Sequence, residues 1–145
     1  MILDYDLQFS DSQALTATAI GANVVDLGAN PTTRDIGTGE EVYLVVQVDT
    51  ELDSAGDAAT LVITLESDST ADLATSATTH YSSGTIAEAT CAAGAELVKV
   101  RLPAGAYERY LGIRYTVAVE NFTSGAISAF LVKDVQADAI LPDAL

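Results

Sequence analysis

Short segments that alternate between apolar and polar residues recur along this chain of 145 residues, and this pattern constrains the fold more than any other feature. Residues 41–49 and 60–66 are the clearest cases, and in each one the apolar side chains fall on alternate positions: Val42, Leu44, Val46 and Val48 in the first, and Leu61, Ile63 and Leu65 in the second. A period of two is that of an extended strand with one buried face. Both segments are therefore predicted to be central β-strands.

Further segments extend this pattern to both ends of the chain. Residues 95–102, 109–119 and 126–133 are rich in Val, Ile, Leu, Tyr and Phe, and weaker candidates are residues 3–9, 15–20, 24–27 and 81–86. Turns are expected at residues 103–105 and 123–125, and residues 68–77 could form a short helical turn. The chain is predicted to be all-β, a jelly-roll-like antiparallel β-sandwich of about eight strands, with another β-sandwich as the alternative.

The length fits one domain spanning residues 1–145. Its ends differ from its middle, because they mix apolar residues with Asp, and Pro142 cannot donate to a ladder. We therefore expect a possible N-terminal arm over residues 1–13 and a C-terminal tail over residues 134–145. Their apolar residues need cover, from this domain or from a neighbour: Ile2, Leu3, Leu7, Phe9, Ile140 and Leu141.

The charge of the chain is strongly acidic, with 21 Asp and Glu against 6 Lys and Arg, a formal net charge of −15. Nucleic-acid binding depends on cationic side chains that neutralise phosphates, so no nucleic-acid partner is expected. The sequence begins without a basic and apolar leader and has no apolar run of membrane length. No membrane partner is expected, and the protein is expected to be synthesised in the cytoplasm.

Residue types that support catalysis are scarce: there is one His, one Cys and no Trp. His80 has no second His to complete a zinc site, and Cys91 has no basic neighbour to activate it. The acidic stretch 49–57 superficially resembles a calcium loop, but Ser54 and Thr60 stand where that loop needs Gly and Glu. We expect no enzyme activity, no catalytic residue, no cofactor and no metal.

Four of the six basic residues fall within sixteen positions: Lys99, Arg101, Arg109 and Arg114. Lys99 and Arg101 are predicted to share one face of a strand, with Arg114 on the next strand. Two interpretations stay open. Either these charges neutralise carboxylates of the same chain, or they form a docking patch for an acidic partner or a second copy.

Several segments, taken in order, resemble the capsid cement (decoration) proteins of certain tailed phages. Residues 103–116 (PAGAYERYLGIRYT) and 123–136 (TSGAISAFLVKDVQ) carry most of the resemblance. It extends to shorter segments at residues 2–4 (ILD), 9–13 (FSDSQ) and 35–40 (DIGTGE). Together these segments span most of the chain.

The resemblance implies a jelly roll on the outer surface of an icosahedral phage head, made in the host cytoplasm, with the major capsid protein as partner. It also implies association with other copies, a dimer being favoured and a trimer possible. On this basis the expected interface residues are Leu3, Tyr5, Phe9, Lys99, Arg101 and Arg114. The alternative function is a carbohydrate- or host-receptor-binding β-sandwich on the virion, which would expose aromatic residues: Tyr81, Tyr107 and Tyr110.

Overall fold

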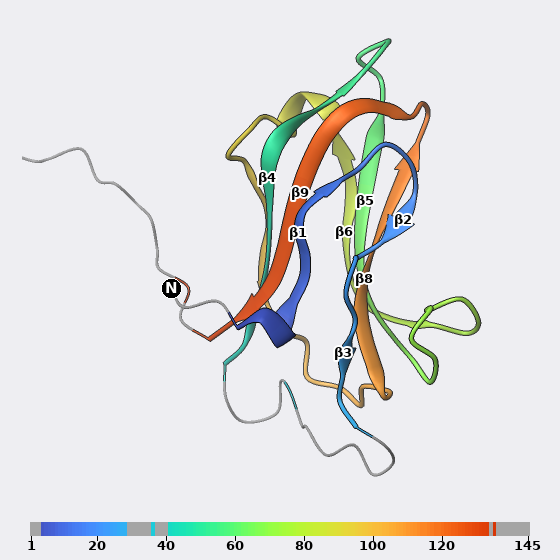
Figure 1. Cartoon of the computed structure of the whole chain (residues 1–145), viewed down its shortest axis with the longest axis vertical. Helices are drawn as coiled ribbons and strands as arrows, with labels where there is room; N and C mark the ends of the chain where they lie inside the picture. Colours follow the sequence, from blue (N-terminus) through green and yellow to red (C-terminus); the bar gives the residue numbers. More distant parts are fainter. Residues whose placement is uncertain (1–3, 29–35, 37–40, 134, 136–145) are drawn as a thin grey trace, which may run out of the picture.

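The structure is a computed structural model that describes residues 4–28, 36, 41–133 and 135. The described residues form nine strands and two 3-10 turns (Figure 1). The strands are β1 (Gln8–Ala14), β2 (Ala19–Ile20), β3 (Val25–Asp26), β4 (Tyr43–Ser54), β5 (Thr60–Asp68), β6 (Thr78–Ala87), β7 (Glu96–Arg101), β8 (Tyr110–Ala118) and β9 (Phe122–Val132). The 3-10 turns are η1 (Tyr5–Leu7) and η2 (Glu88–Thr90).

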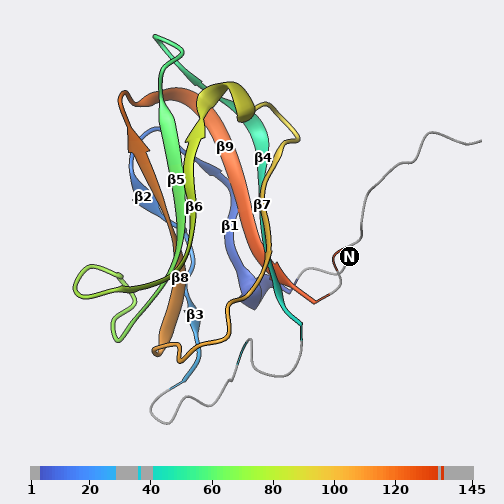
Figure 2. The same cartoon turned by 180° about the vertical axis from the view of Figure 1, so that it is seen from behind.

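The strands form two antiparallel sheets that pack face to face (Figures 1 and 2). Sheet A has the order β1-β9-β4-β7, and sheet B has the order β2-β8-β5-β6. Strand β3 also pairs with β8, so β2 and β3 form one interrupted edge strand. With that strand counted once, the two sheets have four strands each, in the orders of a jelly roll. The predicted all-β jelly-roll fold is confirmed.

The core lies between the sheets and is mainly aliphatic, as the alternating segments predict. In β4 the side chains of Leu44, Val46 and Val48 face the core, and β5 contributes Leu61, Ile63 and Leu65 from the opposite sheet. All six are at most 1% exposed. Each such burial contributes roughly 1.5–3 kcal/mol, so this alternation is what fixes the register of both strands.

One hydrogen bond crosses this core. The Tyr115 hydroxyl of β8 lies 2.8 Å from Oγ of Ser10 in β1, and both residues are fully buried. Burial raises the pKa of Tyr115, so the phenol stays protonated. Gln13 extends the network by accepting from Ser10 Oγ and donating to the carbonyl of Ile20 at 2.9 Å. These bonds join β1 of sheet A to β2 of sheet B along one side of the sandwich.

Strand β1 corrects the expected N-terminal arm over residues 1–13. Gln8–Ala14 pairs with β9, and the Phe9 side chain is fully buried in the core. The strand was not predicted over all of these residues because β1 is polar and its pairing is irregular, with register shifts on both sides of Ser10. Residues 1–3 of the expected arm, including Leu3, lie outside the described residues, as does the expected tail apart from Val135.

A second correction concerns the turn expected at residues 123–125. These residues lie inside β9, and the chain reverses earlier, between Ala118 and Phe122. Gly125 has a φ of +126° and sits against Leu52, where the register of β4 and β9 shifts. The glycine thus marks an irregular point within a strand rather than a turn. Residues 69–77 form turns and bends rather than a helix.

Candidate functional site

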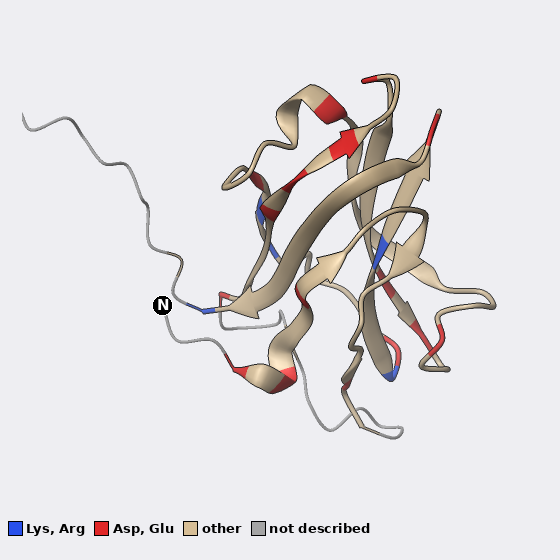
Figure 3. Cartoon of the chain, turned by 45° about the horizontal axis from the view of Figure 1, so that its top comes forward, with Lys and Arg blue, Asp and Glu red and all other residues tan. Residues whose placement is uncertain are grey.

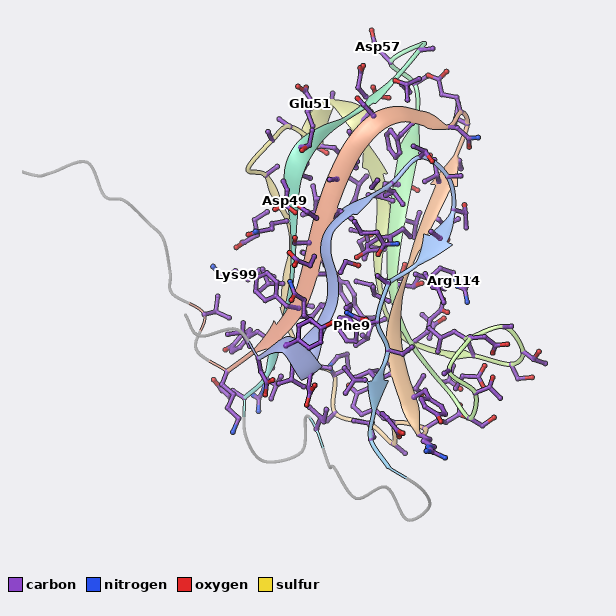
Figure 4. All side chains as sticks on the ribbon, viewed as in Figure 1. Phe9, Asp49, Glu51, Asp57, Lys99 and Arg114 are labelled. Atoms are coloured by element: carbon purple, nitrogen blue, oxygen red, sulfur yellow. The ribbon has the colours of Figure 1, made fainter. Side chains whose placement is uncertain are left out.

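The predicted basic surface is divided between the two sheets. Lys99 and Arg101 stand two residues apart on β7, an edge strand of sheet A, whereas Arg114 lies on β8 in sheet B. Figure 4 shows Lys99 and Arg114 on opposite sides of the molecule. The expectation that Arg114 adds to the charge of Lys99 and Arg101 is wrong, because the chain crosses from sheet A to sheet B between β7 and β8.

Each of these four basic side chains is paired with a carboxylate of its own chain. The pairs are Lys99–Glu96 at 3.5 Å, Arg101–Glu41 at 3.4 Å, Arg109–Asp26 at 2.9 Å and Arg114–Glu66 at 2.9 Å. The first three are exposed, and such pairs add about 0–1 kcal/mol each. Internal neutralisation is thus the structural role of these charges, although Lys99 and Arg101 remain accessible at the sheet edge.

Arg114 does more than neutralise a charge, since it also anchors the β5–β6 excursion, the connection formed by residues 69–77. Its Nε donates to the buried Glu66 carboxylate, and another guanidinium nitrogen donates to the carbonyl of Leu73 at 2.5 Å. Leu73 is 1% exposed and packs over Gly112, where an added Cβ would come within 2.6 Å of it. Arg114 therefore holds residues 69–77 on the outer face of sheet B.

Replacing Arg114 with methionine is expected to lower the free energy of unfolding by about 2 kcal/mol, because the Glu66 carboxylate keeps its burial and loses its counter-charge. Urea denaturation measures this loss, and limited proteolysis should detect earlier cleavage within residues 69–77. Lys99→Met is the matched control. Its exposed pair predicts a change within about 0.5 kcal/mol, and equal effects of the two substitutions would contradict the role given to Arg114.

Two aromatic residues near the N-terminus, Tyr5 and Phe9, are predicted to contact a neighbour, and the structure exposes one and buries the other. Phe9 is 0% exposed and so is not available to a neighbour, which corrects its assignment as a contact residue. Tyr5 in η1 is 75% exposed. It lines a surface pocket of about 300 Å³ together with Asp6, Asn23, Val24 and Asp26. Of the two aromatic residues described at this end, Tyr5 stays a candidate.

His80 links three segments rather than standing alone. Its Nε2 lies 2.7 Å from Oγ of the fully buried Ser67 in β5, which also accepts the Glu108 N–H at 3.1 Å. The ring lies against Tyr107, with centroids 4.5 Å apart. This geometry suits a neutral imidazole that accepts the Ser67 hydroxyl proton. Desolvation lowers the His80 pKa, while the Glu108 charge acts in the opposite direction.

The lowered His80 pKa predicts a pH dependence of stability. Between the ordinary histidine pKa and the lower folded value, the unfolded chain binds more protons than the folded chain. This contribution to stability is present above that window and is lost as the pH falls through it. Urea denaturation between pH 8 and pH 5 should show a smaller decline for His80→Gln than for the natural chain. Identical profiles would contradict the assignment.

Cys91 is fully buried, as expected for a small residue without a reactive role. Desolvation raises the pKa of its thiol. Tyr81 and Tyr107, which the alternative function would expose in a groove, pack against the main core. The Tyr107 hydroxyl also donates to the carbonyl of Pro103.

The end of the sandwich that carries the β4–β5 and β8–β9 turns is strongly acidic. We call this end the distal tip and define it as residues 51–59, 88 and 118–121. Figure 3 shows carboxylate-bearing residues gathered on these loops, and Figure 4 places Asp57 at the extremity. Asp53, Asp57 and Glu88 each offer a carboxylate oxygen, all within 4.8 Å of one another. Oxygen sets of this kind suit Ca²⁺ or Mg²⁺.

Hydrogen bonds from the β4–β5 turn hold the Glu88 carboxylate in place at the distal tip. Glu88 accepts the N–H groups of Ser54 at 2.8 Å and Ala59 at 3.1 Å, and it also accepts from the Ser54 hydroxyl. Glu88 could not be assigned to this site from the sequence, because it lies thirty-one residues beyond Asp57 and reaches the turn only through η2. Its burial follows from these bonds.

Glu120 fixes the β8–β9 turn to the same place. Its Oε1 accepts the N–H groups of Gly56 at 3.1 Å and Ala58 at 2.9 Å, and it lies 2.7 Å from Ser54 Oγ, whose single proton is shared between this carboxylate and that of Glu88. The Ser54 hydroxyl contributes most to lowering the pKa of this carboxyl, followed by the Ala58 amide. The two turns of the distal tip therefore form one hydrogen-bonded unit.

A family model matches most of this chain. The model of the family described as Bbp16 matches residues 9–131, which runs from β1 to the end of β9. No curated protein matches the chain. Among the described residues no helix is long and apolar enough to cross a membrane.

Proposed function

The chain belongs to the Bbp16 family, and on this premise we propose that it is a structural cement, or decoration, protein of a tailed-phage capsid. In this role it binds the outer surface of an icosahedral head and bridges neighbouring major capsid proteins. One observation carries the proposal: the segments that resemble phage decoration proteins build adjacent parts of a jelly roll. Residues 9–13 and 123–132 lie in the paired strands β1 and β9, and residues 110–116 lie in β8.

Such a protein stabilises a shell by binding only its assembled form. A rigid sandwich that spans two capsomers adds burial and hydrogen bonds that separate subunits cannot make, and linkage then favours the assembled state. Symmetry-related sites repeat the contact many times, so modest affinity at each site suffices. The core and the cross-sheet hydrogen bond between Ser10 and Tyr115 supply the rigidity that bridging requires.

The interface residues that remain accessible in this structure are Tyr5, Lys99 and Arg101. Tyr is enriched at the energetic centres of interfaces, and Tyr5 is exposed on η1. Lys99 and Arg101 lie on the outermost strand of sheet A, within reach of a shell subunit or another copy. We include association of copies in the proposal, as a dimer or a trimer on the virion surface.

Co-sedimentation with expanded shells, built from the major capsid protein of the phage that encodes this chain, tests the proposal. We expect saturable binding at a fixed ratio of protein to capsid subunit, counted by gel densitometry. The unexpanded shell serves as a comparison for the stage at which the site forms. Absence of binding by the folded protein would overturn the proposal and favour the receptor-binding alternative.

A further inference from the structure

Val119 has an unusual backbone conformation and an unusually exposed side chain. It follows the end of β8 with a φ of +73°, in the left-handed region, and it is 78% exposed. For a β-branched residue this conformation is an outlier, whereas Gly or Asn adopts it readily. Tyr5 and Val119 are the two large apolar side chains left exposed among the described residues.

The surroundings of Val119 hold this strained turn in place. On its C-terminal side, Glu120 is hydrogen-bonded to Ser54, Gly56 and Ala58, and Phe122 is 2% exposed. The turn is thus anchored on its C-terminal side, while the side chain of Val119 is exposed. Backbone strain at an exposed residue lowers the stability of the isolated chain without any packing in return. Strained residues of this kind are concentrated at functional sites.

The charge around Val119 indicates the chemistry of a partner. Acidic residues from three other parts of the distal tip accompany Glu120 at this end of the sandwich: Glu51, Asp53, Asp57 and Glu88. A surface that combines an exposed apolar side chain with several carboxylates fits an apolar pocket bordered by Lys or Arg. Two copies meeting through this surface would bring like charges together, so a second distal tip is a poor partner.

We propose that the distal tip is one surface through which this protein contacts the shell, separate from Tyr5, Lys99 and Arg101, with Val119 as its apolar anchor. The partner is a capsid subunit that presents an apolar pocket with a basic rim. This inference rests on the proposed function and names a contact surface within it. Burial of Val119 in the complex accounts for a valine at a position that glycine or asparagine would occupy with less strain.

Substitution of Val119 by asparagine or glycine tests the inference, because stability and binding should change differently. Either variant relieves the backbone strain, so we expect thermal unfolding at the natural temperature or above it. Either variant also removes the anchor, so we expect binding to expanded shells to weaken by roughly tenfold, as for a central interface residue. Ser76→Gly is the matched control. Ser76 is exposed with a φ of +67° in the β5–β6 excursion, and its replacement should leave shell binding unchanged.

Shell binding by the Val119 variants equal to that of the natural chain would overturn the inference and leave the cement function intact. Failure of the natural chain to bind shells would instead overturn the cement function, and this inference with it. Hydrogen exchange on the natural protein gives a second test that needs no variant. Amides of residues 117–121 should exchange more slowly on the shell than in the free protein, and unchanged exchange there would also overturn the inference.

Discussion

Replacing Phe9 with alanine is expected to lower the free energy of unfolding by about 3–5 kcal/mol, the usual cost of truncating a buried aromatic side chain. Phe9 is fully buried, and it enters the core from β1 beside Ser10, whose hydroxyl meets Tyr115 of the opposite sheet. The loss should therefore affect the whole sandwich as one cooperative unit. Urea denaturation followed by circular dichroism measures it.

Phe9→Leu is the matched control, since leucine keeps most of the apolar volume and should cost less than half as much. Tyr5→Ala provides a second comparison, because Tyr5 is 75% exposed and its loss should change stability by less than about 0.5 kcal/mol. If Phe9→Ala were as stable as the natural chain, residues 8–13 would belong to a detachable arm, as the sequence predicted for residues 1–13, and the assignment of β1 would be wrong.

Replacing Gly125 with alanine is expected to cost at least about 3 kcal/mol, since it combines backbone strain with overpacking. The added Cβ would lie 2.4 Å from Cδ2 of Leu52 and 2.7 Å from the carbonyl oxygen of Glu51. Leu52 is 1% exposed and cannot move into solvent. The φ of +126° also lies in a region that alanine rarely adopts. Thermal denaturation should show a midpoint lowered by roughly 6–12 °C.

Gly84→Ala separates the two causes. Gly84 also has a positive φ, of +71°, but an added Cβ there would meet nothing within 4 Å. Its replacement should cost only the backbone term, about 1–2 kcal/mol. Equal losses at Gly84 and Gly125 would show that the close approach of β9 to Leu52 has no energetic consequence.

Strands that alternate strongly could be predicted from the sequence, because one face of each is buried regardless of its neighbours. β4 and β5 begin within two residues of their predicted starts, and each extends beyond the predicted end. β5 ends in Glu66, Ser67 and Asp68, which are buried although polar. Their burial depends on Arg114, His80 and the local turn at Ser69 and Thr70, which local periodicity does not encode.

β1 shows where alternation fails as a guide. Its seven residues include one large apolar side chain, Phe9, and its buried polar residue, Ser10, is hydrogen-bonded to β8, while Ser12 and Gln13 bond to β9 and to Ala22 after β2. Those partners lie up to 116 residues away in the chain. Polar residues that become buried only through distant partners resemble a solvated arm in the sequence.

The candidate contact residues depended on topology in the same way. Lys99, Arg101 and Arg114 are close in sequence, yet the connection between β7 and β8 crosses from one sheet to the other. Val119 gave no signal at all, since valine is favoured in strands and disfavoured in a left-handed turn. The acidic stretch 49–57 is evident in the sequence, but its association with Glu88 and Glu120 depends on the fold.

The resistance of the shell to disruption tests the central claim most directly. Expanded shells with and without this protein would be exposed to increasing guanidinium chloride, with the fraction of intact shells measured by light scattering. We predict that saturating protein raises the midpoint of disruption, with the gain increasing with occupancy, as linkage requires. An unchanged midpoint at full occupancy would show that the protein binds without bridging, and would contradict its assignment as a cement.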